Sequence, residues 1–595
     1  MVLESYIVIP AIWWALSSIG YLFFSKYMDK VDIRTGLWRL LIPSLVFGVV
    51  LYILFPGGVV WQSLAIPLAV GVLNQYVYPL FFAVTQRKQN IQYRFPYDFV
   101  MGIYLASLLT ALAVLAGVSG KAGWGGSALL SLAEFLCLGP VFLQLFYFAY
   151  YGESIGDNGI NAFFQTNRKE AGEYMAEIPL AARIAAPLFL VLVAGGLFLL
   201  NLGWGIRPWQ GNVFAGLVPM AAVCFLLFGK GKKSLVWKTA LGTHIHNVWQ
   251  YRKTVIGLHE QMKGMVENLE ATSGLADSGK GTVLVVIGES ANRLHMNAFS
   301  DYERETTPWM SSLSEEDGFF VFKNAYTSWI QTEMAVYLAM TGANQYNGRK
   351  IHEAVSLVDV AGKCGYKTWW YSNQGFVGEH SNIITLIGQG ADHRRWMQED
   401  ASVSQYDGKL MDYLQRVEPG ENNFVVLHLM GSHSNFCSRY PEEWGYWPVP
   451  GGENCVNSYD NSIRYTDHVL KTFWEYAREH LNLQAMVYFS DHGARAEDKR
   501  RPTFTDFEDA RVPFCVYLSE EYRKKYPETA ANLHANRDRY VSNDLVFDLL
   551  CGLMHVDTEQ YDGTADLSSA SYRFTKETAR SNLGRTSLAE DPRFG

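Results

Sequence analysis

Long apolar stretches alternate with short polar connections through the first part of the chain. Several approach the roughly 20 residues with which a helix crosses a bilayer. They cover residues 6–24, 40–55, 59–84, 99–118, 129–151, 180–202 and 213–228. Because the second and the last are short, the pattern predicts about five to seven membrane helices. No small-residue cleavage site follows the first stretch, which we therefore expect to be a retained anchor rather than a signal peptide.

The pattern changes after residue 229. Residues 230–253 mix Lys, His, Trp and Tyr, as a helix lying at a membrane surface does. Farther on, apolar strands alternate with amphipathic stretches such as 405–417 and 462–480, which predicts a mostly parallel central sheet covered by helices on both faces. We therefore divide the chain into a helical membrane domain at 1–229 with a loop near 152–178, an interfacial helix and linker at 230–281, and an α/β domain at 282–595.

Three of the apolar strands run directly into polar side chains. The segment VLVVIGES reaches Glu289, FVVLHLMGSH reaches His433, and AMVYFSDHG reaches Asp491 and His492. Since ligands bind beyond the carboxyl ends of the strands in open α/β sheets, we expect these side chains to share one pocket. Carboxylates and imidazole are ligands that zinc accepts. The sequence therefore predicts a metalloenzyme.

A candidate nucleophile lies in the segment 319–346, which predicts a strand, a loop and then a helix opening near Thr332. A hydroxyl at a helix N-terminus lies beside backbone N–H groups and the positive end of the helix dipole, which favour a phosphate group. A bound metal would lower the pKa of that hydroxyl toward the alkoxide. Composition alone favours a simpler interpretation, in which Thr332 is an N-cap and Glu333 occupies the first turn.

Composition and cysteine spacing bear on compartment and partners. Charged residues make up 18% of the chain, and the net charge of −8 without blocks of like charge does not indicate a nucleic-acid partner. Cys437 and Cys455 bracket a segment rich in Pro, Gly and Trp, as in a loop closed by a disulfide, which would imply an oxidising compartment. Free thiols are the alternative, since seven cysteines cannot pair completely. Basic residues after three apolar stretches favour the cytoplasm instead.

Two ionisable residues lie in apolar surroundings. Glu134 falls inside a predicted membrane helix, where ionisable groups are costly and often functional. A misplaced helix boundary would explain it equally well. His428 lies in the same predicted strand as His433, and we expect it to be a core histidine.

Ordered motifs connect these features to a known family. The succession VIGES, YERETTP, YTSWIQTEMAVYLAMTGA, SNQG, LHLMGSH, RYP, YDNSIRYTD and YFSDHG resembles the membrane-bound phosphoethanolamine transferases of the alkaline phosphatase and sulfatase superfamily. The resemblance extends to FFQTNRKEAGEYM at 163–175 in the membrane part. It looks closest to the class that modifies the heptose of the lipopolysaccharide core, through TSWIQTEMAVYLAMTGA and QYRK at 250–253.

The resemblance implies specific roles for these residues. Glu289, Asp491 and His492 would bind the catalytic zinc, Thr332 would be the nucleophile that also contacts the metal, and His433 would contact the substrate phosphate. The implied reaction moves phosphoethanolamine from phosphatidylethanolamine to Thr332 and then to a hydroxyl of lipopolysaccharide, lipid A or another envelope glycan. The implied location is the bacterial inner membrane, with the loop near 152–178 and the catalytic domain in the periplasm. That location agrees with the disulfide interpretation and overrides the charge bias.

The chain departs from the family pattern after the DHG motif. Ala494 replaces a common Glu, and no histidine follows before His534. Arg495 and the basic residues at 499–501 are candidates to bind the phosphate instead. Asn373 and Gln374, in the SNQG motif, are candidates for orienting the substrate or for satisfying a loop backbone.

Two other functions stay open at this point. A sulfatase or phosphatase of the same superfamily would hydrolyse its substrate, but the C/S-x-P-x-R motif of sulfatases is missing around Thr332. A membrane sensor with a degenerate domain would not need Glu289, Asp491 and His492 together. The metal-dependent transferase is therefore the leading interpretation.

Overall fold

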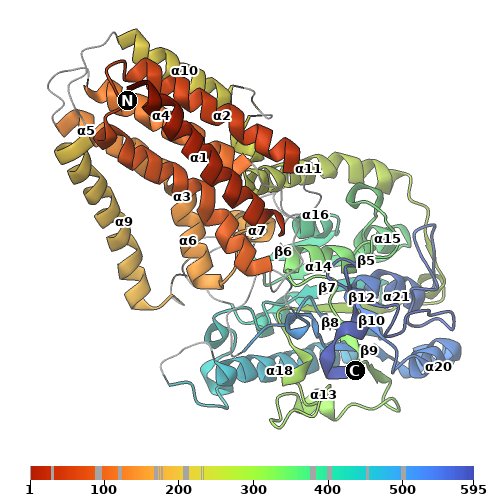
Figure 1. Cartoon of the computed structure of the whole chain (residues 1–595). Helices are drawn as coiled ribbons and strands as arrows, with labels where there is room; N and C mark the ends of the chain where they lie inside the picture. The colour runs from red at the N-terminus through yellow and green to blue at the C-terminus, as the bar shows by residue number, and fades with distance from the viewer. Residues whose placement is uncertain are drawn as a thin grey trace. The chain divides into compact units, whose positions relative to one another are not determined.

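The computed structural model divides into two compact units, one formed by residues 1–164 and 178–250 and the other by 165–177 and 251–595 (Figure 1). The chain passes from the first to the second within α11 (Ala240–Glu267). The domain bounds expected from the sequence stay a prediction. The structure describes residues 2–27, 33–86, 97–117, 124–165, 172, 175, 178–205, 213–229, 231, 234–375, 383–397, 405–450, 455–496, 504 and 506–594. Most of the 163–175 motif and the basic residues at 499–501 lie outside these ranges.

The first unit is helical, and its helices match the apolar stretches of the sequence. They are α1 (Val2–Ser25), α2 (Ile33–Leu54), α3 (Trp61–Gln86), α4 (Tyr97–Gly117), α5 (Trp124–Cys137), α6 (Gly139–Tyr151), α7 (Asp157–Gln165), α9 (Leu180–Leu200) and α10 (Val213–Phe228). Among the described residues, five helices are long and apolar enough to cross a membrane, and α5 with α6 would make a sixth span. The chain is thus a multi-pass membrane protein.

The span expected at 129–151 is broken. The helices α5 and α6 meet at an angle of 45°. Pro140 lies in the first turn of α6, where it donates no backbone hydrogen bond and its ring excludes a continuous helix across Leu138. The apolar stretch predicted at 129–151 is thus present as two helices that are long and apolar enough only when taken together.

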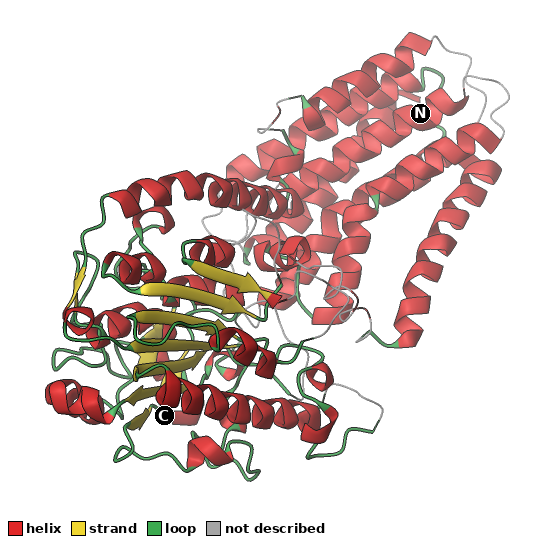
Figure 2. Cartoon of the chain, turned by 180° about the vertical axis from the view of Figure 1, so that it is seen from behind, coloured by secondary structure: helices red, strands yellow, loops and turns green. Residues whose placement is uncertain are grey.

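The second unit is built on a seven-stranded sheet (Figure 2). In spatial order the strands are β3 (Phe319–Val321), β9 (Phe514–Leu518), β8 (Leu483–Ser490), β2 (Thr282–Gly288), β7 (Asn423–His428), β5 (Lys367–Ser372) and β6 (His393–Trp396). All neighbours are parallel except for β9, which is antiparallel to β8 and β3. The prediction of a mostly parallel sheet is confirmed.

Helices cover both faces of this sheet because the side chains of β2 alternate between two cores. Val283, Val285 and Ile287 pack on one side, with α14 (Thr332–Ala339), α15 (Leu357–Lys363), α16 (Ile383–Gln389) and α21 (Val546–Leu553). Leu284 and Val286 pack on the other side, with α18 (Val456–His480). A strand buried on both faces reads as an uninterrupted apolar run, and β2 does so.

Two local predictions differ from the structure. The stretch 405–417 forms a short 3-10 turn followed by α17 (Met411–Leu414), rather than one amphipathic helix. No disulfide joins Cys437 to Cys455 in the structure, in contrast to the expectation. The Cys455 thiol lies at the start of α18, where Ser458 Oγ is 3.7 Å from its sulfur.

Candidate metal centre

The centre forms where β2 and β8 end side by side. Gly288 and Ser490 are register partners, so Glu289 and Asp491 emerge from adjacent strand ends. The Asp491 N–H donates to the Gly288 carbonyl at 3.0 Å, and Asp491 Oδ1 accepts from the Ser290 N–H at 3.0 Å. These bonds turn both carboxylates toward the same space beyond the sheet.

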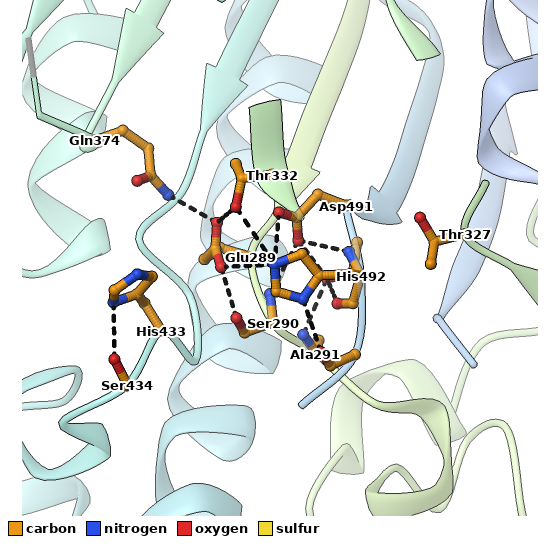
Figure 3. A network of polar contacts seen from close by, with 12 residues as sticks. Glu289, Ser290, Ala291, Thr327, Thr332, Gln374, His433, Ser434, Asp491 and His492 are labelled. Carbon is orange, nitrogen blue, oxygen red and sulfur yellow. Dashed lines mark hydrogen bonds and ion pairs between the residues drawn. The ribbon is translucent and has the colours of Figure 1, made fainter. Parts of the chain in front are cut away.

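The four residues predicted for metal and nucleophile come together here (Figure 3). Within the described part of the chain, Glu289, Asp491 and His492 are the one group of three that could hold a metal ion, with ligand atoms within 4.8 Å of one another. His492 Nε2 lies 3.4 Å from Glu289 Oε1 and 3.3 Å from Asp491 Oδ2. Thr332 Oγ1 lies 3.0 Å from Glu289 Oε2 and 3.3 Å from His492 Nε2.

The electrostatics of this group favour a bound cation. Glu289, Asp491 and His492 are all buried. Burial and the nearby Glu289 charge raise the pKa of Asp491 well above its usual range, against hydrogen bonds from backbone N–H groups that lower it. Two buried carboxylates that both ionise need a compensating positive charge. Asp491 Oδ2 accepts no hydrogen bond from the described residues, which suits a metal ligand.

The tautomer of His492 also fits a metal. Its Nδ1 lies 2.7 Å from the Gly493 carbonyl, which can only accept, so Nδ1 carries the proton. In the neutral ring the lone pair is then on Nε2, which faces the two carboxylates. A ligand histidine held by a carbonyl on its other nitrogen is the usual arrangement around zinc. The donors present therefore fit a divalent cation such as zinc.

Thr332 is the first residue of α14 and not its N-cap. Gln331 occupies the N-cap position, with extended backbone and no capping side chain. The simpler interpretation of Thr332 is therefore wrong. Its hydroxyl instead donates to Glu289 Oε2 from the positive end of the α14 dipole. An attacking oxygen and a phosphate would both be stabilised at this point.

His433 lies beside the cluster. The chain leaves β7 at His428 and turns at Gly431, whose φ is +50°. The His433 N–H donates to the Met430 carbonyl at 3.1 Å, and its ring Nδ1 lies 3.5 Å from Ser434 Oγ. Figure 3 shows the His433 ring on the same side of the cluster as Gln374. That position leaves His433 available to a group bound next to Thr332.

The two residues of the SNQG motif have different environments. Gln374 Nε2 donates to Glu289 Oε2 at 3.2 Å and to the Leu429 carbonyl at 2.7 Å, so this side chain belongs to the centre. Asn373 is buried, and its amide donates to Asp407 Oδ1 at 2.8 Å. Asp407 in turn accepts from the N–H groups of Met430 and Gly431, both at 2.8 Å. Asn373 therefore holds the turn that carries His433 and does not face the centre.

Arg495 is engaged by acidic neighbours. Its Nε donates to Asp509 Oδ2 at 3.0 Å and its Nη2 to Asp506 Oδ1 at 2.5 Å. These carboxylates raise the pKa of Arg495 above its ordinary value, against the effect of burial. A guanidinium compensated by two carboxylates has little charge left for a phosphate. Arg495 is therefore a poor replacement for the later histidine of the family pattern.

One residue of the centre has no sequence signal. Asn543 is buried, and its Nδ2 donates to the Asp491 carbonyl at 2.7 Å and to Thr327 Oγ1 at 3.1 Å. Its Oδ1 accepts from the Ser328 N–H at 2.9 Å. Asn543 thus joins the turn of the metal group to the loop that precedes Thr332.

Comparison with known proteins defines the class. Residues 281–556 match the Sulfatase family. The integral membrane protein lipooligosaccharide phosphoethanolamine transferase A (EptA) from Neisseria meningitidis has the same fold, with a TM-score of 0.57 at 16% identity over 85% of this chain and 98% of that chain. The chain therefore combines a sulfatase-family domain with a unit of apolar helices, and this arrangement has the fold of that membrane protein.

Sequence relatives narrow this class. Phosphoethanolamine transferase EptC from Escherichia coli (strain K12) is 27% identical over 542 residues, which cover 80% of this chain and 91% of that protein. Phosphoethanolamine transferase CptA from Salmonella typhimurium (strain LT2) is 26% identical over 547 residues, with the same coverage of 80% and 91%. The chain thus carries a sulfatase-family domain and is similar in sequence to phosphoethanolamine transferases, the resemblance that its ordered motifs predicted.

Proposed function

We propose that this protein transfers phosphoethanolamine from phosphatidylethanolamine to a cell-envelope acceptor, with the lipopolysaccharide core or lipid A as the first candidates. The first unit would lie in the bacterial inner membrane and the second in the periplasm. The observation that carries the proposal is the position of Thr332, whose hydroxyl lies at a helix N-terminus within 3.3 Å of both Glu289 and His492. The names of the relatives EptC and CptA support the transferred group.

Glu289, Asp491 and His492 would hold zinc, with the Thr332 oxygen in contact with it. When bound, zinc supplies Lewis-acid stabilisation of the threonine oxygen and of the charge on the phosphoryl group. The hydrogen bond that His492 Nδ1–H donates to the Gly493 carbonyl fixes the ring orientation in which Nε2 faces the two carboxylates.

The residues of the chain carry the two transfers. Thr332 Oγ1 attacks the phosphorus, and the new P–O bond forms as the bond from phosphorus to the diacylglycerol oxygen breaks. Glu289 Oε2, which accepts the hydroxyl hydrogen bond at 3.0 Å, is the nearest base for the proton. The acceptor hydroxyl then attacks the same phosphorus and breaks the bond to Thr332. His433 is placed to stabilise the phosphoryl oxygens or to move a proton, to the departing diacylglycerol oxygen in the first transfer and from the acceptor hydroxyl in the second. The Gln374 amide instead holds Glu289 in position.

Intact-mass analysis of the purified full-length protein tests the covalent step. After incubation with phosphatidylethanolamine we expect a single phosphoethanolamine adduct on the wild type and none on Thr332→Val. Thr341→Val is a matched control, because Thr341 is a buried threonine that follows the same helix and whose hydroxyl donates to the Tyr337 carbonyl one turn earlier. An adduct that persists on Thr332→Val removes Thr332 from its role.

Metal analysis tests the centre separately. We expect the zinc content of the purified protein to fall in Glu289→Ala and Asp491→Ala, and full occupancy in both variants would count against the site. Adding lipopolysaccharide core or lipid A to the protein that carries the adduct identifies the acceptor. A true acceptor gains the mass of phosphoethanolamine while the protein returns to its unmodified mass.

A further inference from the structure

A polar stripe runs along α5, inside the apolar first unit. Ser127, Ser131 and Glu134 are spaced by four and then three residues, so they lie on one face of the helix. Their exposed fractions are 0%, 5% and 0%, so this face is turned into the protein and not toward lipid. A carboxyl group in such a place is costly and calls for a partner or a function.

Asn201 closes the stripe from a second helix. It follows α9 and begins a π-helical turn, Asn201–Gly205, with an exposed fraction of 2%. Its Nδ2 donates to Glu134 Oε2 at 2.6 Å and to Ser131 Oγ at 2.9 Å. The other carboxyl oxygen, Glu134 Oε1, and Ser127 Oγ have no hydrogen-bond partner among the described residues.

Among the described residues, none of the ion pairs involves Glu134. Arg183, near the start of α9, lies at the opposite end of that helix from Asn201. An ionised carboxylate without a counter-ion costs several kcal/mol in such surroundings. A neutral carboxyl, with its proton on the unpartnered Oε1, removes most of that cost.

We propose that Glu134 is an intramembrane proton-binding site, which takes up and releases a proton through the serine stripe of α5. The stripe starts one turn from Trp124, whose ring lies 5.6 Å from Phe198 near the C-terminal end of α9. Glu134 lies about 10 Å deeper than Ser127 along the helix. Figure 1 shows these ends of α5 and α9 together, so the proton would come from that side of the first unit.

The position of the site suggests what the proton acts on. Leu138, four residues after Glu134, is where α5 ends and the chain bends by 45° into α6. The π-helical turn at Asn201 is a second irregularity on the other side of the same carboxyl. Gain or loss of a proton therefore changes the charge between two breaks in helical structure. This inference does not depend on the chemistry at Thr332.

A hydrophobic carbodiimide tests the site in the full-length protein in detergent. The protonated carboxyl adds to the reagent: its proton moves to one nitrogen, its oxygen bonds to the central carbon, and the acyl group then shifts to nitrogen as a stable acylurea. We expect one adduct, mapped to the α5 peptide, and none on Glu134→Gln. Glu153→Gln should keep the adduct, because Glu153 is a second buried glutamate among the described residues of this unit and accepts a hydrogen bond from Tyr147.

The dependence on pH separates proton binding from mere reactivity. Labelling of the wild type should fall as pH rises, by about tenfold for each pH unit once most of the carboxyl is ionised. In Asn201→Ala the donor that favours the ionised form is gone, so labelling should persist to higher pH. An adduct retained on Glu134→Gln, no adduct on the wild type, or labelling that does not change with pH would each overturn the proposal.

Discussion

Replacing Asn543 by Ala tests a residue that supports the metal group without contributing a ligand atom to it. The Asn543 side chain donates to the Asp491 carbonyl at 2.7 Å and accepts from the Ser328 N–H at 2.9 Å. Neither atom of Asn543 touches the ligand side of Glu289, Asp491 or His492. Any change in metal binding in Asn543→Ala therefore acts through the position of the Asp491 turn and of the loop before Thr332.

The magnitude follows from the bonds that are lost. Asn543→Ala leaves the Ser328 N–H and the Asp491 carbonyl buried without their partner, at about 1–3 kcal/mol for each group. The free energy of unfolding should fall by roughly 2–6 kcal/mol. Residues that orient ligands from behind typically change metal affinity by about 10–100-fold, and we expect a loss in that range. Formation of the Thr332 adduct should slow along with it.

Asn536→Ala provides the matched control. Asn536 is also buried, and its amide donates to the Leu567 and Ser569 carbonyls at 2.9 and 3.1 Å, far along the chain from the centre. Both variants should lose stability in denaturant unfolding, while only Asn543→Ala should bind zinc more weakly in competition with a chelator. Equal zinc affinities in the two variants would refute the reasoning, whatever their stabilities.

Three other substitutions have defined outcomes. In Gly431→Ala the new Cβ would lie 2.5 Å from the Glu289 carbonyl at a φ of +50°, so we expect a loss of about 1–3 kcal/mol in denaturant unfolding and slower adduct formation. Burial lowers the pKa of His428 from 6.5 to about 4. Between these two pH values the unfolded chain binds more protons than the folded chain, so the free energy of unfolding falls by up to about 3 kcal/mol as pH falls from 6.5 to 4. His428→Phe should therefore unfold with a weaker dependence on acid pH, and an unchanged dependence would contradict this. Arg495→Gln should leave the KM for donor lipid within about twofold, because Asp506 and Asp509 already compensate this guanidinium, and a large rise in KM would restore it as a phosphate ligand.

The strand ends could be predicted because their signal is local. An apolar run and the polar residue after it identify both the strand and its carboxyl end, and parallel pairing places those ends together. Glu289, Asp491 and His492 were found in this way, and the start of α14 placed Thr332 beside them. The metal role of these residues stays a prediction, since position alone does not identify an ion.

Side-chain direction could not be predicted in the same way. Asn373 and Gln374 are consecutive and chemically alike, but only Gln374 points to Glu289. Asn373 turns instead toward Asp407, whose carboxylate is 34 residues away and is recognised only in the folded chain. Cys437 and Cys455 show the same limit, because the composition of the segment between them suits a closed loop but does not determine whether a bond joins the two sulfurs.

The support of the centre depends on contacts with still longer separation. The Gly493 N–H, next to the ligand turn, donates to the Asp509 carbonyl at 2.8 Å, and a side chain at Gly493 would meet that carbonyl at 3.3 Å. Arg511, two residues after Asp509, forms an ion pair with Asp591 at 2.5 Å. The Arg511 carbonyl accepts a hydrogen bond from the Arg293 N–H at 3.3 Å. Asp591 is 80 residues from Arg511, and their ion pair is buried. The support of the Asp491–His492 turn therefore comes partly from the C-terminal segment, which no pattern around the DHG motif reveals.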